Sequence, residues 1–213
     1  MEPITLSTGR LTLRPLEERD VDAVTAACQD PEILRWIPLP EPYEREHAEQ
    51  FVLEVSGAGW HEDTMYNFGV FTKERAEEEE EEEDGGDGGD GGGALVGSMG
   101  LVRIGQLSSP ERQAEIGFWT AKEHRGRGYT AEAARAVAGW AFDALGVERL
   151  EWVAQVGNVG SLAVADRLGF VQEGVQRARI VHRGTRRDAW VAALLPSDWD
   201  RPSDTPYLPS RTG

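Results

Sequence analysis

The chain has 213 residues and a formal net charge of −16, with 22 Lys and Arg against 38 Asp and Glu. This acidity argues against nucleic acid as a partner, because binding to a phosphate backbone depends on Lys and Arg. Cys28 is the only cysteine, which excludes an internal disulfide, and the sequence shows neither an apolar run of membrane-spanning length nor a signal peptide. We therefore expect a cytoplasmic protein with no membrane partner and a single domain over residues 1–195.

Most of the negative charge lies in residues 74–93. This segment holds eleven acidic residues against Arg75 alone and so supplies ten of the sixteen net negative charges. Its like charges repel and its glycines have nothing to pack, which predicts a disordered loop inserted in a hairpin. The alternative is a charged arm that recruits a basic partner. The remaining chain is only mildly acidic.

The first half of the chain predicts a strand, three helices and a hairpin. Residues 9–16 alternate as a strand, and a helix follows through Val21, Val24 and Ala27. A short helix at 33–36 precedes a proline-rich link, and residues 44–56 are helical by pattern. Residues 66–72 and 95–104 read as the two strands on either side of the acidic loop.

The second half predicts further strands around two helices. A strand at 115–120 leads through a basic glycine turn into a helix that ends near Gly146. A strand at 150–156, a helix at 158–168 and two strands at about 170–182 and 186–195 follow. Four prolines and few apolar residues predict a flexible tail over 196–213. Strands and helices without strict alternation predict an α+β or mixed α/β domain.

The glycine turn after residue 120 has the composition of an anion site. The first turn of a helix has unpaired N–H groups at the positive end of its dipole. Gly126 and Gly128 let the backbone approach a ligand, and Arg125 and Arg127 add charge. A phosphate or pyrophosphate fits these features. The alternative is an ordinary strand–turn–helix corner with two solvated arginines.

Several ordered motifs resemble the GNAT superfamily of acyl-CoA-dependent N-acyltransferases. Arg125, Gly128 and Thr130 match the family signature [Q/R]-x-x-G-x-[G/A], with Thr in place of the final small residue. Residues 158–161 (NVGS), followed by Leu-Gly-Phe at 168–170 and Glu-Gly at 173–174, resemble its second motif. The segments TGRLTLRPLEERD at 8–20 and WIPLPEPY at 36–43 resemble the branch that acetylates ribosomal-protein N-termini. The resemblance covers roughly residues 8–195.

The resemblance implies a fold and a cofactor site. The fold would be a central, mostly antiparallel twisted sheet of about seven strands flanked by helices, with two middle strands splayed apart. The pantetheine arm of acetyl-CoA, the co-substrate, would enter that gap. Ligand spacing among the histidines is absent, so no metal is expected. The residues implied to contact the cofactor are Phe118, Trp119, Thr120, Arg125, Gly126, Arg127, Gly128, Tyr129, Thr130, Asn158 and Ser161.

The implied reaction is direct transfer of an acetyl group to a primary amine in a ternary complex. Glu115 is the candidate base, because burial could raise its pKa; a structural salt bridge is the alternative. By resemblance Asn158 would hold a pantetheine amide and Ser161 would lie near the thioester sulfur, whereas a helix cap and a small packing residue are the alternatives. Many family members have a tyrosine acid four positions after that serine. Here Ala165 takes its place.

The acceptor is left open by the sequence. By resemblance, Trp36 and Tyr43 would form part of the acceptor wall. The leading hypothesis is a protein or peptide N-terminal α-amine. A small amine, such as an antibiotic, a polyamine or an amino acid, is the second, and the mild acidity of the fold would suit a cationic acceptor. A non-catalytic acyl-CoA-binding regulatory protein is the third, because Thr130 and Ala165 depart from the family pattern. A monomer and a homodimer are both compatible with the sequence.

Overall fold

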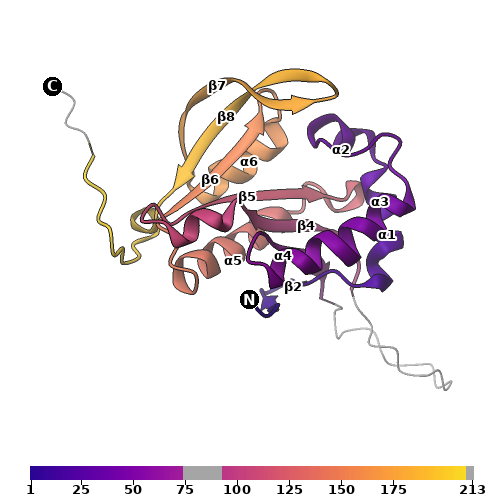
Figure 1. The fold of residues 1–213 in the computed structure, drawn as a ribbon, viewed down its shortest axis with the longest axis horizontal. Helices are drawn as coiled ribbons and strands as arrows, with labels where there is room; N and C mark the ends of the chain where they lie inside the picture. The colour runs from indigo at the N-terminus through magenta and orange to yellow at the C-terminus, as the bar shows by residue number, and fades with distance from the viewer. Residues whose placement is uncertain (74–92, 210–213) are drawn as a thin grey trace.

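The computed structural model describes residues 1–73 and 93–209, which are arranged around one mixed sheet (Figure 1). Its eight strands lie in the order β1-β2-β3-β4-β5-β6-β8-β7. Each neighbouring pair is antiparallel except β5 and β6. The architecture agrees with the predicted fold class. The predicted acidic loop falls on residues 74–92, outside the described residues.

The strands are β1 (Leu6–Ser7), β2 (Leu11–Arg14), β3 (Tyr66–Thr72), β4 (Leu95–Val102), β5 (Gln113–Thr120), β6 (Arg149–Gln155), β7 (Val171–His182) and β8 (Thr185–Leu194). The α-helices are α1 (Val21–Cys28), α2 (Pro31–Trp36), α3 (Arg45–Glu49), α4 (Gly57–His61), α5 (Tyr129–Asp143) and α6 (Val159–Leu168). The 3-10 turns are η1 (Glu18–Asp20), η3 (Ile104–Ser108), η4 (Lys122–His124) and η5 (Pro196–Trp199), and η2 (Gln50–Ser56) is a π-helix.

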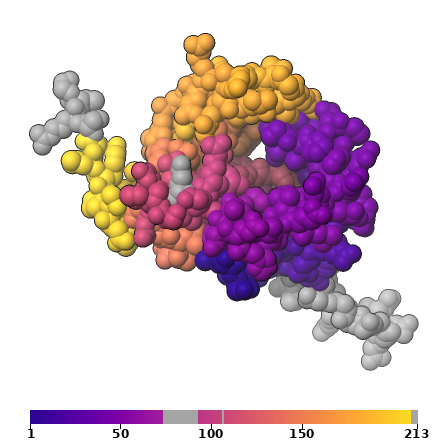
Figure 2. All heavy atoms as spheres, viewed as in Figure 1, coloured from indigo at the N-terminus to yellow at the C-terminus, as the bar shows by residue number. Residues whose placement is uncertain are grey.

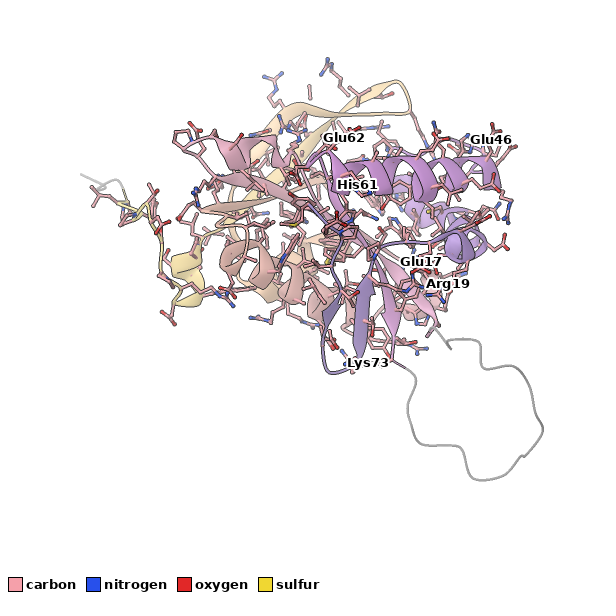
Figure 3. All side chains as sticks on the ribbon, turned by 60° about the horizontal axis from the view of Figure 1, so that its bottom comes forward. Glu17, Arg19, Glu46, His61, Glu62 and Lys73 are labelled. Atoms are coloured by element: carbon pink, nitrogen blue, oxygen red, sulfur yellow. The ribbon has the colours of Figure 1, made fainter. Side chains whose placement is uncertain are left out.

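The helix predicted at 44–56 extends farther than its pattern indicates. α3, the π-helical η2 and α4 follow one another without a break from Arg45 to His61. Figure 3 shows them as one rod, with Glu46 near one end and Glu62 near the other. Both carboxylates are exposed. This long helix therefore turns a charged side to solvent while its apolar side packs on the sheet.

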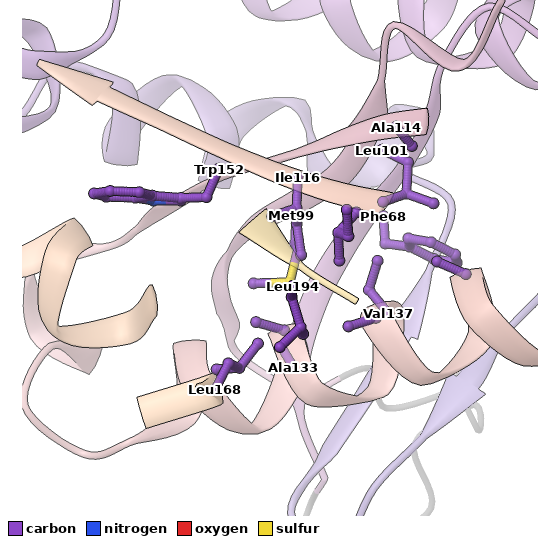
Figure 4. Packing of buried hydrophobic residues seen from close by; sticks show 14 of the residues in the cluster. Phe68, Met99, Leu101, Ala114, Ile116, Ala133, Val137, Trp152, Leu168 and Leu194 are labelled. Atoms are coloured by element: carbon purple, nitrogen blue, oxygen red, sulfur yellow. The ribbon is translucent and has the colours of Figure 1, made fainter. Parts of the chain in front are cut away.

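Two apolar cores cover the two faces of the sheet. The larger one packs α5 and α6 against the strands, and Figure 4 shows Ile116 and Trp152 of β5 and β6 among its members, with Val137 of α5. The smaller core joins α1, α2, α3 and η2 through residues such as Val24 and Val52. Burial on both faces explains why the central strands are nearly continuous runs of buried residues.

The segment after β8 differs from the predicted loose tail in its first part. The Trp199 indole N–H donates to the Leu168 carbonyl oxygen at 2.9 Å, and its ring meets Phe142 edge-on at 5.7 Å between centroids. The Arg135 guanidinium lies 4.8 Å from the Trp199 ring centroid. Trp199 therefore packs η5 against α5 and α6. The proline-rich composition of the segment does not reveal this contact.

Trp199→Ala should therefore lower the free energy of unfolding by about 2–3 kcal/mol, because it removes a ring contact and leaves a helix-end carbonyl without its donor. Tyr207→Ala, at a tyrosine that is 67% exposed, is the matched control and should stay within about 0.5 kcal/mol. Urea unfolding measures both. Equal stabilities would contradict the docking of η5.

Candidate functional site

The site originates where β5 and β6 part. The two strands pair in parallel only over Gln113–Glu115 with Arg149–Glu151. Beyond these residues β5 runs on to Thr120 along β4, while β6 runs on to Gln155 along β8. The edge of β5 that faces β6 therefore carries backbone N–H and C=O groups without a strand partner. A ligand can bond to these groups as a third strand would.

A cleft of about 720 Å³ lies at the parted ends. It is bounded by α2, the end of β5, the turn before α5 and the first turns of α6. Its lining includes Trp36, Phe118, Trp119, Thr120, Arg125, Gly126, Gly128, Thr130, Asn158, Ser161 and Arg167. Figure 2 shows the surface hollowed between the β7–β8 hairpin, in orange, and the α2 region, in purple.

The glycine turn shows the geometry of an anion site. Gly126 and Gly128 adopt left-handed conformations, with φ of 73° and 78°, and Gly128 is the N-cap of α5. An added Cβ at Gly126 would meet nothing within 4 Å, and one at Gly128 would lie 3.6 Å from Arg167 Nη1. The turn therefore exposes backbone N–H groups beside a guanidinium that α6 supplies.

Thr130 lines the cleft, and its hydroxyl is held by a hydrogen bond. Its hydroxyl lies 2.6 Å from the Thr120 hydroxyl, so the start of α5 is tied to the end of β5. Arg125 adds a second tie, since its Nε donates to the Thr120 carbonyl at 3.1 Å and its Nη2 lies 2.5 Å from Asp30 Oδ2. Asp30 in turn caps α2. The substitution of Thr for a smaller residue is thus accommodated.

The first turn of α6 supplies polar groups on the opposite side of the cleft. Asn158 Oδ1 caps the helix by accepting from the Ser161 N–H at 3.2 Å, which leaves the Asn158 amide N–H groups available. Ser161 Oγ accepts from the Trp152 indole N–H at 2.9 Å. The Ser161 hydroxyl can therefore still donate its own proton. Ala165, one turn further on, is 2% exposed and brings no acid.

Glu115 lies outside this cleft, in a second cavity of about 210 Å³ lined also by Arg103, Gln113, Ala114, Glu151 and Arg179. Glu115 Oε2 is 3.1 Å from Arg103 Nε. Because side chains alternate along a strand, Glu115, Gly117 and Trp119 share one face of β5. A Cβ at Gly117 would meet nothing within 4 Å. Gly117 therefore adds no side chain between Glu115 and Trp119 on this face of β5.

The charge of Glu115 is set by opposing effects. Burial raises the pKa of the Glu115 carboxyl above its ordinary value, and the Glu151 carboxylate adds to the increase. The Arg103 and Arg179 guanidiniums act in the opposite direction and lower the pKa without cancelling the effect of burial. Glu115 thus combines the raised pKa expected of a base with the ion pair that the sequence left as the alternative.

Besides Glu115, three of the predicted residues do not line the cleft. Tyr43 is buried in the smaller core beside Cys28, where burial raises the pKa of the Cys28 thiol to about 12. Tyr129 packs under the Arg10 guanidinium, 4.6 Å from the ring centroid. Arg127 is exposed and contributes its carbonyl oxygen to Arg10. The spacing of residues in a strand or turn does not show whether a side chain faces the cleft, the core or solvent.

Arg167 is a charged residue of the cleft that the sequence did not indicate. It lies in the last turn of α6, about two and a half turns after Asn158, where the motif begins. Only the packing of α5 against α6 brings its guanidinium to Gly128. In residues 1–73 and 93–209, no cluster of His, Cys, Asp and Glu could hold a metal ion, and no helix is long and apolar enough to cross a membrane.

Comparisons with known proteins agree on one family. Residues 10–171 match the family described as an acetyltransferase (GNAT) domain. YdaF of Bacillus subtilis (strain 168), provisionally named as a ribosomal N-acetyltransferase, is 37% identical over 101 residues, which cover 47% of this chain and 55% of YdaF. The aligned part of the chain thus spans about half the length of that relative.

Two solved structures share the fold. One from Vibrio cholerae, provisionally titled a ribosomal-protein-serine acetyltransferase, matches with a TM-score of 0.74 at 25% identity, covering 92% of this chain and 100% of that one. Mycobacterium smegmatis RimJ in complex with CoA-disulfide matches with a TM-score of 0.76 at 20% identity, covering 94% and 93% of the two chains.

The raised pKa of Glu115 predicts a gain in stability for Glu115→Gln at neutral pH. A raised pKa means that folding favours the protonated carboxyl, so the ionised form costs stability as pH rises through the folded-state pKa. The gain in melting temperature at about pH 8 should therefore shrink as the pH falls toward about 5.

Glu173→Gln is the control of opposite sign. Hydrogen bonds from Arg149 lower the pKa of Glu173, so its carboxylate stabilises the fold above its unfolded-state pKa. This variant should melt below the wild type, and its deficit should persist to a lower pH. Thermal unfolding across this pH range checks both variants, and a loss of stability in Glu115→Gln at pH 8 would contradict the reading of its pKa.

Proposed function

The chain belongs to the GNAT acetyltransferase family, as the match over residues 10–171 shows, and from that premise we propose an acetyl-CoA-dependent transfer of an acetyl group to a primary amine. The resemblance drawn from its motifs is confirmed, and the chain is an acyltransferase with ribosomal-protein acetyltransferases among its relatives. The observation that carries the finer proposal is the meeting of the glycine turn, the parted strands and the first turn of α6 in one cleft.

The residues of the cleft fit acetyl-CoA in three places. N–H groups at Gly126 and Gly128, with Arg125 and Arg167 beside them, suit a diphosphate. The unpaired edge of β5 suits the amide groups of a pantetheine arm. The free amide N–H groups of Asn158 suit the same arm from the side of α6. When bound, acetyl-CoA would supply a thioester carbonyl for attack and a thiolate as the leaving group.

A side chain of the protein would then remove the proton from the acceptor amine. An amine that is protonated near neutral pH must lose its proton before it attacks, and Glu115, whose pKa is raised by burial, is the candidate for accepting it. A Cβ at Gly117 would meet nothing within 4 Å, and we take solvent along this face of β5 as the route of the proton from the amine to Glu115. The Arg103 ion pair holds the carboxylate in place.

Two other groups would stabilise the negative charges that develop on the leaving thiolate and on the carbonyl oxygen. Ser161 accepts a hydrogen bond from the Trp152 indole and keeps a proton that it can direct toward the thiolate. An unpaired backbone N–H of β5 near Phe118–Thr120 would donate to the oxyanion. This assignment needs no tyrosine at position 165, where the buried Ala165 stands.

We take a peptide N-terminal α-amine as the acceptor class, supported by the ribosomal-protein acetyltransferases among the relatives and structural neighbours. Trp36, which lines the cleft from α2, stays a candidate wall residue, whereas Tyr43 lies in the core.

Gly128→Ala should weaken acetyl-CoA binding by about tenfold, because an L-residue at this left-handed position is strained by about 1–2 kcal/mol. Gly105→Ala is the matched control, since a Cβ there would meet nothing within 4 Å and its φ is not positive. Calorimetric titration with acetyl-CoA measures both. Unchanged affinity in Gly128→Ala would remove the glycine turn from the site.

Glu115→Gln should lower kcat for acetyl transfer by about a hundredfold at neutral pH, because the amine loses its base, while the Kd for acetyl-CoA stays the same. CoA release with peptides that begin with Ser or Ala, beside a panel of small amines, measures this, and Glu173→Gln is the charge-matched control. Turnover on small amines alone would change the acceptor class. No CoA release with any peptide or small amine, together with retained binding of acetyl-CoA, would favour a non-catalytic acyl-CoA-binding protein.

A further inference from the structure

The β7–β8 hairpin is strongly basic in a chain whose net charge is −16. Between residues 177 and 187 it carries five arginines, all exposed: Arg177, Arg179, Arg183, Arg186 and Arg187. The only other charged or titratable groups in residues 176–188 are His182, which is buried, and Asp188, which is exposed. Figure 1 shows the hairpin arching over the side of the sheet where β5 and β6 part.

A bulge in β7 directs Arg179 to the Glu115 cavity. The pairing of β7 with β8 is irregular between Gln176 and Ile180, and Ala178 has a φ of 55°. The Ala178 N–H donates to Asp188 Oδ1 at 2.9 Å, and Arg186 Nη1 donates to the Ala178 carbonyl at 3.0 Å. Left-handed backbone at a non-glycine residue persists only where its surroundings hold it, and bulges re-aim side chains beside sites.

The positive charge of this region is only partly neutralised. Arg103 pairs with Glu115, and Arg149 pairs with Glu151. Within residues 1–73 and 93–209, no carboxylate forms an ion pair with Arg177, Arg179 or Arg187. The cavity and the hairpin above it therefore hold unpaired cations next to a carboxylate suited to an amine.

We propose that the acceptor is a peptide whose N-terminal amine is followed closely by acidic residues, and that Arg179 and the arginines of the β7–β8 hairpin bind those carboxylates. This rests on the proposed function and names the substrate class of the same site. An extended peptide advances about 3.4 Å per residue, so acidic side chains at its second and third positions lie within about 10 Å of the amine. The amine passes its proton through solvent to Glu115, while the carboxylates meet Arg179, which lines the same cavity as Glu115.

The same cavity disfavours a nucleic acid. Glu115 and Glu151 line it together with the arginines, so a chain of closely spaced phosphates would meet carboxylates as well as guanidiniums. An acidic peptide has one ammonium group at its N-terminus, followed by carboxylates. The ammonium group complements the Glu115 carboxylate in the cavity, and the carboxylates complement the arginines of the hairpin. Charge complementarity therefore commits the surface to a peptide.

The test compares three peptides that differ only at positions two and three: Ser-Glu-Glu, Ser-Gln-Gln and Ser-Lys-Lys before a common neutral sequence. For the wild type, kcat/KM should be highest for the acidic peptide, by about tenfold over the neutral one, and this preference should fall as salt is raised. Anisotropy of labelled peptides measures binding without turnover and should follow the same order.

Arg179→Gln should remove most of the preference for the acidic peptide. Arg19→Gln is the control for loss of one positive charge: Arg19 pairs with Glu17 on the far side of the molecule from the hairpin (Figure 3), and its variant should keep the preference. Melting temperatures check that both variants are folded. If the ratio of kcat/KM for the acidic peptide to kcat/KM for the neutral peptide fell equally in both variants, Arg179 would not be the residue that binds the carboxylates.

These measurements test the acidic acceptor and the acetyl-transfer reaction separately. Equal kcat/KM and equal binding for the three peptides, or displacement of every peptide alike by a single-stranded RNA oligonucleotide, would overturn the acidic acceptor while leaving acetyl transfer intact. Binding of the acidic peptide that depends on Arg179, without CoA release, would support the surface and overturn the reaction. No binding and no turnover would overturn both.

Discussion

The parting of β5 from β6 after three paired residues is the constraint on which the site depends. Parallel strands that stayed paired would bury their edges and leave no backbone to a ligand. Here each strand is held by a different antiparallel partner, β4 on one side and β8 on the other. The rigid halves of the sheet keep the gap open. The first turns of α5 and α6 both reach it because each helix begins just after one of the parted strands.

Side-chain ties hold α2 across this gap. Arg125 connects the glycine turn to Asp30 at the start of α2. At the other end, Gln155 Nε2 donates to the Trp36 carbonyl at 3.1 Å, and the hairpin residue Arg183 donates to the Leu34 carbonyl at 3.3 Å and pairs with Glu41. These contacts join residues that are at least 95 positions apart in the chain. The cleft wall that α2 provides is therefore supported from both halves of the sheet.

Charge is distributed in a way that the net value hides. Ten of the sixteen net negative charges belong to residues 74–93, whereas the β7–β8 hairpin concentrates arginines beside the Glu115 cavity. Over distances longer than about 10 Å, salt screens exposed charges, so a ligand responds to the local field. The mild acidity of the fold had suggested a cationic acceptor, but the arginines of the β7–β8 hairpin make such an acceptor the less suitable partner of the local surface.

The sequence alone determined the family, the order of strands and helices, and the glycine turn at 126–128, because each depends on local spacing and on φ angles that only glycine adopts freely. The tertiary structure decided which side chains face the cleft. Packing of α5 on α6 brings Arg167 to the turn, burial of Tyr43 beside Cys28 removes it, and Trp199 docks a segment that composition had suggested was loose. Such outcomes depend on contacts between residues far apart in the chain, and a one-dimensional pattern carries no record of those contacts.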